Sequence, residues 1–131
     1  MSIDPADKLI AAHPLVFKGE TPRWCDVPAG WYERVDRLFT ELENELSEDD
    51  LRQLRVSQFR EKLASLHFYF SLGTEDGASF DRVRGLINEA RSDCSKLCQF
   101  CGEPGEVPAN WIEVLCERHR QEMIDRVNDA K

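Results

Sequence analysis

Four residues of metal-ligating types near the C-terminus constrain this chain more than any other feature. Cys98, Cys101, Cys116 and His119 form a C-x2-C pair and a C-x2-H pair, separated by 14 residues. Each pair offers two ligands about one turn apart, and zinc takes thiolate and imidazole ligands in a tetrahedral set. Four protein ligands leave no open position for a catalytic water. We therefore expect a structural Zn2+ in a small C-terminal lobe.

The residues around the two pairs predict how this lobe is built. The segment Cys98-Gln-Phe-Cys-Gly has the form of a zinc knuckle, in which the glycine permits a tight turn after the second cysteine. Residues 103–107 and 111–115 are expected to form a short hairpin. The second ligand pair falls at the first turn of a last helix over residues 117–128, where the positive end of the helix dipole suits a thiolate. Knuckle, hairpin and helix-borne pair resemble a treble-clef arrangement.

The residues of this lobe bear on two possible functions, nuclease activity and nucleic-acid binding. Nucleases of the HNH type need histidines in the hairpin and helix after the knuckle, and residues 102–115 contain none. Residues 96–131 carry five bases against seven acids, whereas a surface that binds a phosphate backbone needs the opposite balance. We expect no enzymatic activity and consider nucleic-acid binding unlikely. A zinc-finger nucleic-acid-binding or regulatory module is the alternative function.

The remaining cysteines and the N-terminus bear on the compartment. Cys94 falls on the apolar stripe of a predicted helix and is expected to be a small buried core residue. Cys25 has no neighbouring partner in the sequence and is expected to be a buried structural thiol. The N-terminus lacks the basic start and apolar stretch of a signal peptide, and the apolar runs are too short to cross a membrane. We expect a cytoplasmic protein that does not bind membranes.

The net charge of −8 is concentrated in one segment. Residues 41–50 contain six acids and no base, whereas the rest of the chain carries 17 bases against 19 acids. Such a field attracts basic surfaces and repels phosphates, so we predict that the segment binds a protein partner with a basic surface. The alternative is a solvated helix end whose charge only aids solubility. The predicted partner-binding residues are Glu41, Glu43, Glu45, Glu48, Asp49 and Asp50.

Apolar periodicity predicts two long helices packed on a β-hairpin. Apolar residues recur at helical spacing from Trp31 to Leu46, and residues 80–97 show the same pattern. Residues 66–72 alternate between apolar and polar, which indicates a strand, and residues 53–60 are expected to pair with it. The first long helix is expected to end inside the acidic segment, where its acids would oppose the helix dipole.

Capping and proline signals predict the shorter elements. Asp4 as N-cap and Pro5 at the first helical position predict a helix over residues 5–12. Residues 14–30 contain prolines and glycines and are expected to form an ordered loop. Ser79 is the expected N-cap of the second long helix.

The predicted elements add up to one domain of the α+β class. The chain has 131 residues, the size of one ordinary domain. We expect residues 1–93 to form the helix, hairpin and helix body and residues 94–131 to form the zinc lobe. The last helix is expected to turn three apolar side chains inward, those of Met123, Ile124 and Val127.

Three motifs follow one another in the chain: Gly30-Trp31, the strand segment Leu66-His67-Phe68-Tyr69, and the zinc pairs. In this order, over residues 25–119, they resemble a group of small uncharacterised proteins encoded by bacteria and their phages. Residues 63–65 depart from the group, since an aromatic residue and a glycine are expected there. The resemblance implies a metal-containing protein of phage or mobile-element origin and brings no established activity. Together with the acidic segment, it leads us to expect a non-enzymatic inhibitor that occludes a basic, nucleic-acid-binding site of a host defence complex such as CRISPR-Cas.

Overall fold

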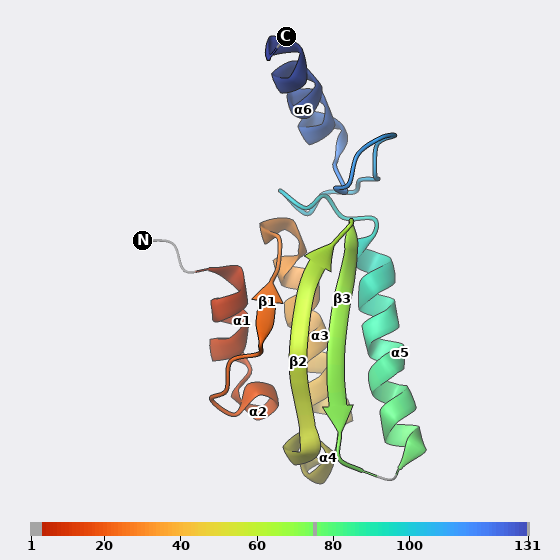
Figure 1. Cartoon of the computed structure of the whole chain (residues 1–131). Coiled ribbons are helices and arrows are strands. Elements are labelled where there is room, and N and C mark those ends of the chain that lie inside the picture. The colour runs from red at the N-terminus through yellow and green to blue at the C-terminus, as the bar shows by residue number, and fades with distance from the viewer. Residues whose placement is uncertain (1–3, 75, 131) are drawn as a thin grey trace.

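The computed structural model describes residues 4–74 and 76–130, which form an α+β fold with a three-stranded sheet (Figure 1). This confirms the predicted fold class, with more short elements than the sequence indicated. The helices are α1 (Pro5–Ala12), α2 (Pro14–Phe17), α3 (Tyr32–Glu45), α4 (Glu48–Gln53), α5 (Gly77–Cys94) and α6 (Glu117–Asp129), with a 3-10 turn η1 (Ala29–Trp31) before α3. The strands are β1 (Trp24–Asp26), β2 (Leu54–Lys62) and β3 (Ser65–Leu72).

The predicted hairpin is confirmed as the antiparallel pair of β2 and β3. The strand order of the sheet is β1-β2-β3, so β2 is the central strand and β3 is an edge strand. Its turn lies at Leu63 and Ala64. Both residues have positive φ, 52° and 66°, a conformation that two-residue hairpin turns require and that glycine or asparagine adopts more easily.

The segment predicted as a loop, residues 14–30, contains α2, β1 and η1 instead. The strand β1 pairs in parallel with β2, in the register Trp24↔Gln58 and Cys25↔Phe59. A strand of three residues has no periodicity that a sequence can show, because its hydrogen-bond partner lies more than thirty residues away. The predicted hairpin is therefore the larger part of a three-stranded sheet.

The core lies between one face of the sheet and the helices α3 and α5. Phe39 of α3 contacts three phenylalanine rings at centroid distances of 4.9 to 5.8 Å, those of Phe17, Phe59 and Phe68. The predicted apolar stripes of both long helices point into this core. Cys94 is fully buried there, as predicted, and burial raises the pKa of its thiol to about 12. Cys25 is only half-buried, against the edge of the core.

The long helix α5 begins earlier than predicted. Asp76 and not Ser79 is its N-cap, because the Asp76 carboxylate accepts a hydrogen bond from the backbone N–H of Ala78 at 2.9 Å. The Ser79 hydroxyl instead donates to Asp50 of α4 at 2.6 Å. The helix ends at Cys94, three residues before the predicted end, and a turn then leads to the first pair of predicted ligands.

The acidic segment is divided between two helices, which corrects the prediction about its dipole. The helix α3 ends at Glu45, and the Ser47 hydroxyl then accepts a hydrogen bond from the N–H of Asp50 at 3.1 Å, which starts α4. Glu48, Asp49 and Asp50 thus occupy the first turn of a helix, where negative charge is favourable. The predicted cost applies only to the acids at the end of α3.

The last helix α6 has the predicted bounds to within one residue but the wrong packing. It projects away from the body at one end of the molecule (Figure 1), and it has no buried residue. Met123 and Ile124 are half-buried and Val127 is 44% exposed. The inward orientation predicted for these residues is wrong for Val127 and only partly confirmed for Met123 and Ile124, because α6 projects from the rest of the described chain.

No helix among the described residues is long and apolar enough to cross a membrane.

Candidate metal centre

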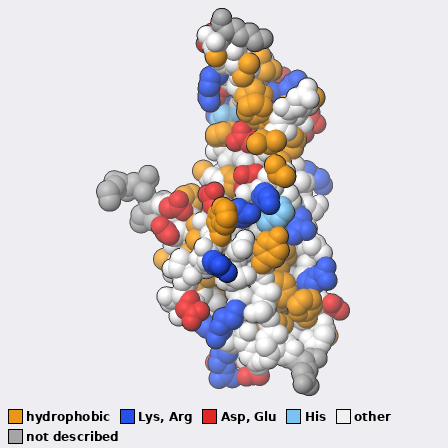
Figure 2. Space-filling view, viewed as in Figure 1, with side chains coloured by type: hydrophobic (Ala, Val, Ile, Leu, Met, Phe, Trp, Pro, Cys, Tyr) orange, Lys and Arg blue, Asp and Glu red, His pale blue; other side chains and the backbone are white. Residues whose placement is uncertain are grey.

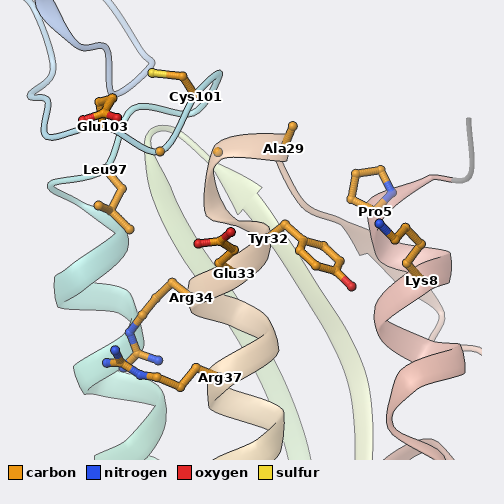
Figure 3. Close-up of a pocket in the computed structure, with 12 residues that line it drawn as sticks. Pro5, Lys8, Ala29, Tyr32, Glu33, Arg34, Arg37, Leu97, Cys101 and Glu103 are labelled. Carbon is orange, nitrogen blue, oxygen red and sulfur yellow. The ribbon is translucent and has the colours of Figure 1, made fainter.

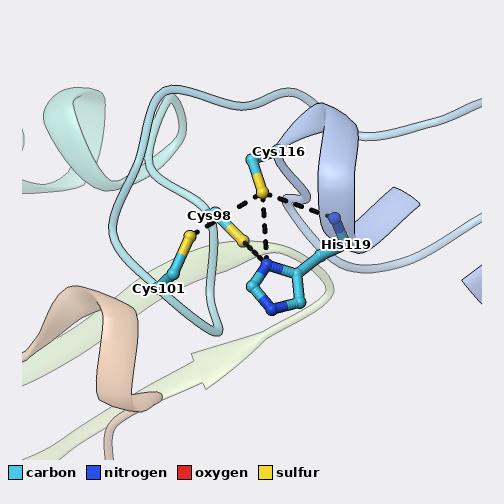
Figure 4. A group of neighbouring side chains, drawn as sticks. All are labelled: Cys98, Cys101, Cys116 and His119. Atoms are coloured by element: carbon cyan, nitrogen blue, oxygen red, sulfur yellow. Dashed lines mark hydrogen bonds between the residues drawn. The ribbon is translucent and has the colours of Figure 1, made fainter. Parts of the chain in front are cut away.

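The four predicted ligands lie together at the base of α6 (Figure 4), with all their ligand atoms within 4.8 Å of one another. The Sγ atoms of Cys101 and Cys116 are 3.7 Å apart, and His119 Nδ1 lies 3.4 Å from Cys98 Sγ and 3.2 Å from Cys116 Sγ. A tetrahedron with metal–sulfur bonds of about 2.3 Å and metal–nitrogen bonds of about 2.1 Å has edges of about 3.6 to 3.8 Å. The arrangement is therefore compatible with a metal ion at its centre.

The first ligand pair is held by the turn that the sequence predicted. Gly102 has a φ of 79°, in the left-handed region that favours glycine. Its N–H donates to the Cys98 carbonyl at 2.9 Å, and the Cys98 N–H donates to the Glu103 carbonyl at 2.7 Å. These bonds fold the segment back on itself, so that Cys98 and Cys101 present their sulfur atoms on the same side. Cys98 is buried, whereas Cys101 is exposed.

The second pair lies at the start of α6, also as predicted. Cys116 is the N-cap, and its sulfur accepts a hydrogen bond from the N–H of His119 at 3.4 Å. The Nδ1 atom of His119 faces the sulfurs, while Nε2 points outward, 3.9 Å from the Glu122 carboxylate and 3.3 Å from Arg118. Nδ1 is therefore the ring nitrogen placed to bind a metal. The ring of Phe100 stacks on the imidazole at a centroid distance of 5.3 Å.

The electrostatics of the cluster also fit a cation. Burial raises the pKa of the Cys98 thiol, but three backbone N–H groups, those of Cys116, Cys101 and Phe100, lower it by more, to about 7. At Cys101 the N–H of Glu103 lowers the pKa, but desolvation and the neighbouring thiols outweigh it, and the pKa is raised. Thiols this close resist ionising together. A divalent cation among them removes that repulsion.

Sequence reasoning missed the residues that join this centre to the body. The Gly30 N–H donates to the Gln99 carbonyl at 2.9 Å, and the Trp31 indole N–H donates to the Leu97 carbonyl at 2.9 Å. A Cβ at Gly30 would lie 2.0 Å from the carbonyl oxygen of Cys98, so the two backbones meet where only glycine fits. The Gly30-Trp31 motif was noted in the sequence, but only the fold shows what it touches.

One buried side-chain amide and one β-bridge hold the segment between the ligand pairs in place. Gln99 is only 5% exposed, and its side-chain oxygen accepts a hydrogen bond from the N–H of Val114 at 2.8 Å. The hairpin predicted within residues 103–115 is reduced to a single bridge, Glu106↔Leu115. Gln99 gave no signal in the sequence, because a glutamine between two ligands is expected to be exposed.

A cleft of about 750 Å3 lies between the metal-binding turn and the start of α3 (Figure 3). Cys101 borders it, as do Arg34 and Arg37, whose guanidinium groups lie close together. Both donate to Asp93 of α5, at 2.7 and 3.3 Å. Both arginines are therefore paired with Asp93, and charged side chains line the cleft beside the candidate metal centre.

The six predicted partner-binding acids do not form one surface. Five of them contact a side chain within the fold, and the partners come from several elements. The contacts are Glu41 with Arg34 (3.3 Å) and Arg37 (3.5 Å), Glu43 with His13 (2.6 Å), Glu45 with Arg82 (3.5 Å), Asp49 with Arg52 (2.9 Å) and Asp50 with Ser79 (2.6 Å).

The acids also point in different directions. Glu41 reaches arginines on its own helix beside α5, whereas Glu43 is turned to the junction of α1 and α2. Glu45, Glu48 and Asp49 are exposed where α3 ends and α4 begins. Among the described residues Glu48 has no ion pair, and the pairs of the other two are solvent-exposed. We call these three residues the acidic corner.

Comparison with protein-family models, curated proteins and solved structures finds no match for this chain. Its class therefore follows from the fold and the site alone. It is an α+β protein with a C-terminal Cys3His cluster that is compatible with a metal ion.

Proposed function

We propose that the Cys3His cluster binds Zn2+ and that this ion has a structural role. Three thiolates and one imidazole form a ligand set typical of structural zinc, whereas magnesium and calcium prefer oxygen ligands. The four ligands would complete a tetrahedron, so that neither water nor substrate reaches the ion. The ion would supply binding free energy that is also folding free energy for the lobe.

We further propose that the protein is a non-enzymatic interaction protein that binds a basic protein surface. The observation that carries this proposal is an apolar groove of about 460 Å3 between α2 and α4, directly beside the acidic corner. A groove with an apolar floor and a charged rim has the composition of a protein-binding site. The apolar residues that line it are Pro14, Leu15, Leu46 and Leu51.

The charges around the groove favour a basic partner. Glu48 lines the groove without an ion pair among the described residues. The two bases of the lining are engaged already: Lys18 donates to the carbonyls of Val16 and Leu54 at 3.2 and 2.9 Å, and Arg52 pairs with an acid. Leu15 is 59% exposed and offers an apolar contact to the partner. A partner with a basic residue beside an apolar side chain would match this site.

Reversal of the acidic corner tests this proposal. Partners are captured from a host lysate by the metal-loaded protein and identified by mass spectrometry, and the affinity of each purified partner is then measured at several salt concentrations. We expect a basic partner whose binding weakens with salt and is strongly reduced by the combined change of Glu45, Glu48 and Asp49 to lysine. Affinity that survives both changes contradicts the proposal.

Two further variants make the result specific. Reversal of two exposed acids of α5, Asp81→Lys with Glu89→Lys, is the matched control, because it changes the net charge on another helix. Leu15→Ser tests the groove itself. We expect normal affinity for the α5 variant and reduced affinity for Leu15→Ser. An equal loss in the α5 variant would reduce the mechanism to net charge, and normal affinity of Leu15→Ser would exclude the groove.

We extend the proposal to the setting that the sequence resemblance implies. There the basic partner is a nucleic-acid-binding component of a host defence complex such as CRISPR-Cas, and the acidic corner occupies the place of phosphates. What supports this step is the charge complementarity alone. Expression of the protein in a host with active defence should raise plaque counts of a targeted phage, and the corner-reversed variant should not.

A further inference from the structure

The face of the sheet opposite the core is not covered by a helix of the described chain. The helices α3 and α5 pack on the other face, and Figure 2 looks onto the open one. Side chains alternate along a strand, so the register of the sheet identifies which residues share this face. One row across the three strands is Trp24, Gln58 and Tyr69, and the next is Asp26, Arg60 and His67.

Two of these residues have large aromatic side chains that are exposed to solvent. Trp24 is 52% exposed and Tyr69 is 53% exposed. They lie two strands apart in the same row, about 10 Å from each other by the usual strand spacing, with Gln58 between them. The guanidinium of Arg60 lies over the Trp24 ring, 3.7 Å from its centroid, and the His67 ring is 6.5 Å from that of Tyr69.

The open face is also basic, although the protein as a whole carries a net charge of −8. Arg55, Arg60 and Lys62 alternate along β2 on this side, and none of them forms an ion pair with a described residue. The surroundings of His67 show the same field. Desolvation is the main cause that lowers the pKa of His67. The positive charges of Arg91, Lys62 and Arg60 lower it further, and the negative charge of Glu61 opposes them.

Figure 2 shows the combination directly. Blue basic side chains and orange apolar ones lie next to each other over the strands, together with a histidine. We propose that this face binds single-stranded nucleic acid, with bases stacked on Trp24 and Tyr69 and phosphates contacted by the cations of β2. Exposed aromatic rings on an open sheet stack bases of any sequence, and flanking cations follow the backbone.

Each part of the surface has a role in this mode of binding. Gln58, between the two rings, offers an amide donor and acceptor to the edge of a stacked base. Arg60 holds the Trp24 ring by a cation–π contact and presents charge to a phosphate. An acidic peptide would use the cations but not the two rings. The combination therefore favours a nucleic acid over an acidic protein.

The open face is separate from the acidic corner, and its basic character cannot be seen in the sequence. Acids and bases are mixed along the chain, including in residues 96–131. Folding separates them, because the acidic corner lies at the α3–α4 end and the bases of β2 lie on the open side of the sheet. A basic surface on an acidic protein is visible only once the register of the strands is known.

The test is the binding of fluorescently labelled oligonucleotides of about 12 nucleotides to the full-length, metal-loaded protein, measured by fluorescence anisotropy. The probes are oligo(U), oligo(dU) and a mixed-sequence DNA duplex. We expect both single strands to bind better than the duplex and their binding to weaken as salt rises. Tighter binding of oligo(U) than of oligo(dU) would identify RNA as the ligand through its 2′-hydroxyl groups, and the reverse order would identify DNA.

Substitutions on the open face locate the site. Trp24→Ala and Tyr69→Ala should each weaken single-strand binding roughly ten-fold or more, and Trp24→Phe should restore part of the loss. Lys62→Gln should weaken it less and reduce its salt dependence. The matched controls are Ile112→Ala, an exposed apolar residue between the two ligand pairs, and Arg84→Gln, an exposed base on α5. Both controls should bind as the unchanged protein does, and circular dichroism checks that every variant folds.

Three results would overturn the proposal. The first is no binding of either single strand at low salt. The second is binding that is equal in the aromatic variants and in the controls, which would place the site elsewhere. The third is binding of poly-glutamate with the same affinity and the same response to Trp24→Ala and Tyr69→Ala, which would assign the face to acidic proteins.

Discussion

In the body, residues 5–94, phenylalanines from α2, α3, β2 and β3 meet in one core, together with the apolar stripes of both long helices. In the C-terminal lobe, residues 95–130, burial is confined to the residues around the four candidate ligands. Val114 and Leu115 are the buried aliphatic residues described there, and α6 buries none. From this difference we expect the body to fold by apolar burial and the lobe to depend on its ligands and on its contact with the body.

The difference teaches that one chain can contain two separately stabilised parts. The joint between them is small: the Gly30 backbone lies against the first ligand pair, and the Trp31 indole donates to the Leu97 carbonyl. Damage to the lobe should therefore leave the body folded, and damage to the core of the body should leave the ligand set intact. The predictions that follow test this in order of decreasing effect.

Loss of a metal ligand should have the largest effect. We expect Cys101→Ser, or removal of the metal by a chelator, to unfold residues 95–130, because structural zinc contributes about 10 kcal/mol or more in small zinc peptides. Cys101 is exposed, so serine there would be harmless unless the sulfur binds a metal. The measurement is amide hydrogen exchange by mass spectrometry, with Cys25→Ser as the control outside the cluster. Unchanged protection of the lobe after verified metal loss would refute a structural role of the ion.

A cavity in the body should have the next largest effect. Phe39→Ala removes the ring at the centre of the aromatic core and should lower the free energy of unfolding by about 3 to 5 kcal/mol. Zinc affinity should stay near that of the unchanged protein at temperatures where the variant is folded. Denaturant unfolding followed by circular dichroism gives the first quantity and competition with a chelating dye the second. A large loss of metal affinity would mean that the two parts are not separately stabilised.

A methyl group at the joint should cost less but affect both parts. Gly30→Ala places a Cβ against the Cys98 carbonyl and should lower the free energy of unfolding by about 1 to 3 kcal/mol and weaken metal binding. Gly85→Ala is the matched control, because that glycine lies within α5 with open space around it, and alanine there should stabilise the protein by about 0.5 to 1 kcal/mol. Thermal unfolding and metal titration of both variants compare them. If Gly30→Ala behaves like the control, the joint is looser than described.

The smallest effect is expected on α6. Val127→Ala removes a side chain that is 44% exposed and should change the free energy of unfolding by less than about 0.5 kcal/mol. The same change at the fully buried Val83 of α5 should cost about 2 kcal/mol. Denaturant unfolding of the two variants measures the contrast. A large loss for Val127→Ala would indicate that α6 packs against something in solution.

Much of the local structure could be predicted because its cause is local. The ligand set follows from the spacing of the two pairs, the turn at Gly102 from the conformation that glycine allows, and both long helices from their apolar stripes. The ends of elements were less predictable, since nearby residues compete for the same role. Asp76 caps α5 in place of Ser79, and Ser47 starts a new helix in the middle of the acids.

The sequence by itself thus determined the α+β class, the two long helices, the hairpin and the four residues of the metal centre. Only the tertiary structure decided that β1 joins the sheet, that Gly30 lies against the first ligand pair, and that α6 has no core to pack on. It also distributed the charge, pairing most of the acids of residues 41–50 within the fold and gathering Arg55, Arg60 and Lys62 on the open sheet face. The physical reason is that these features depend on contacts between residues distant in the chain, and neither periodicity nor capping records which segments will meet.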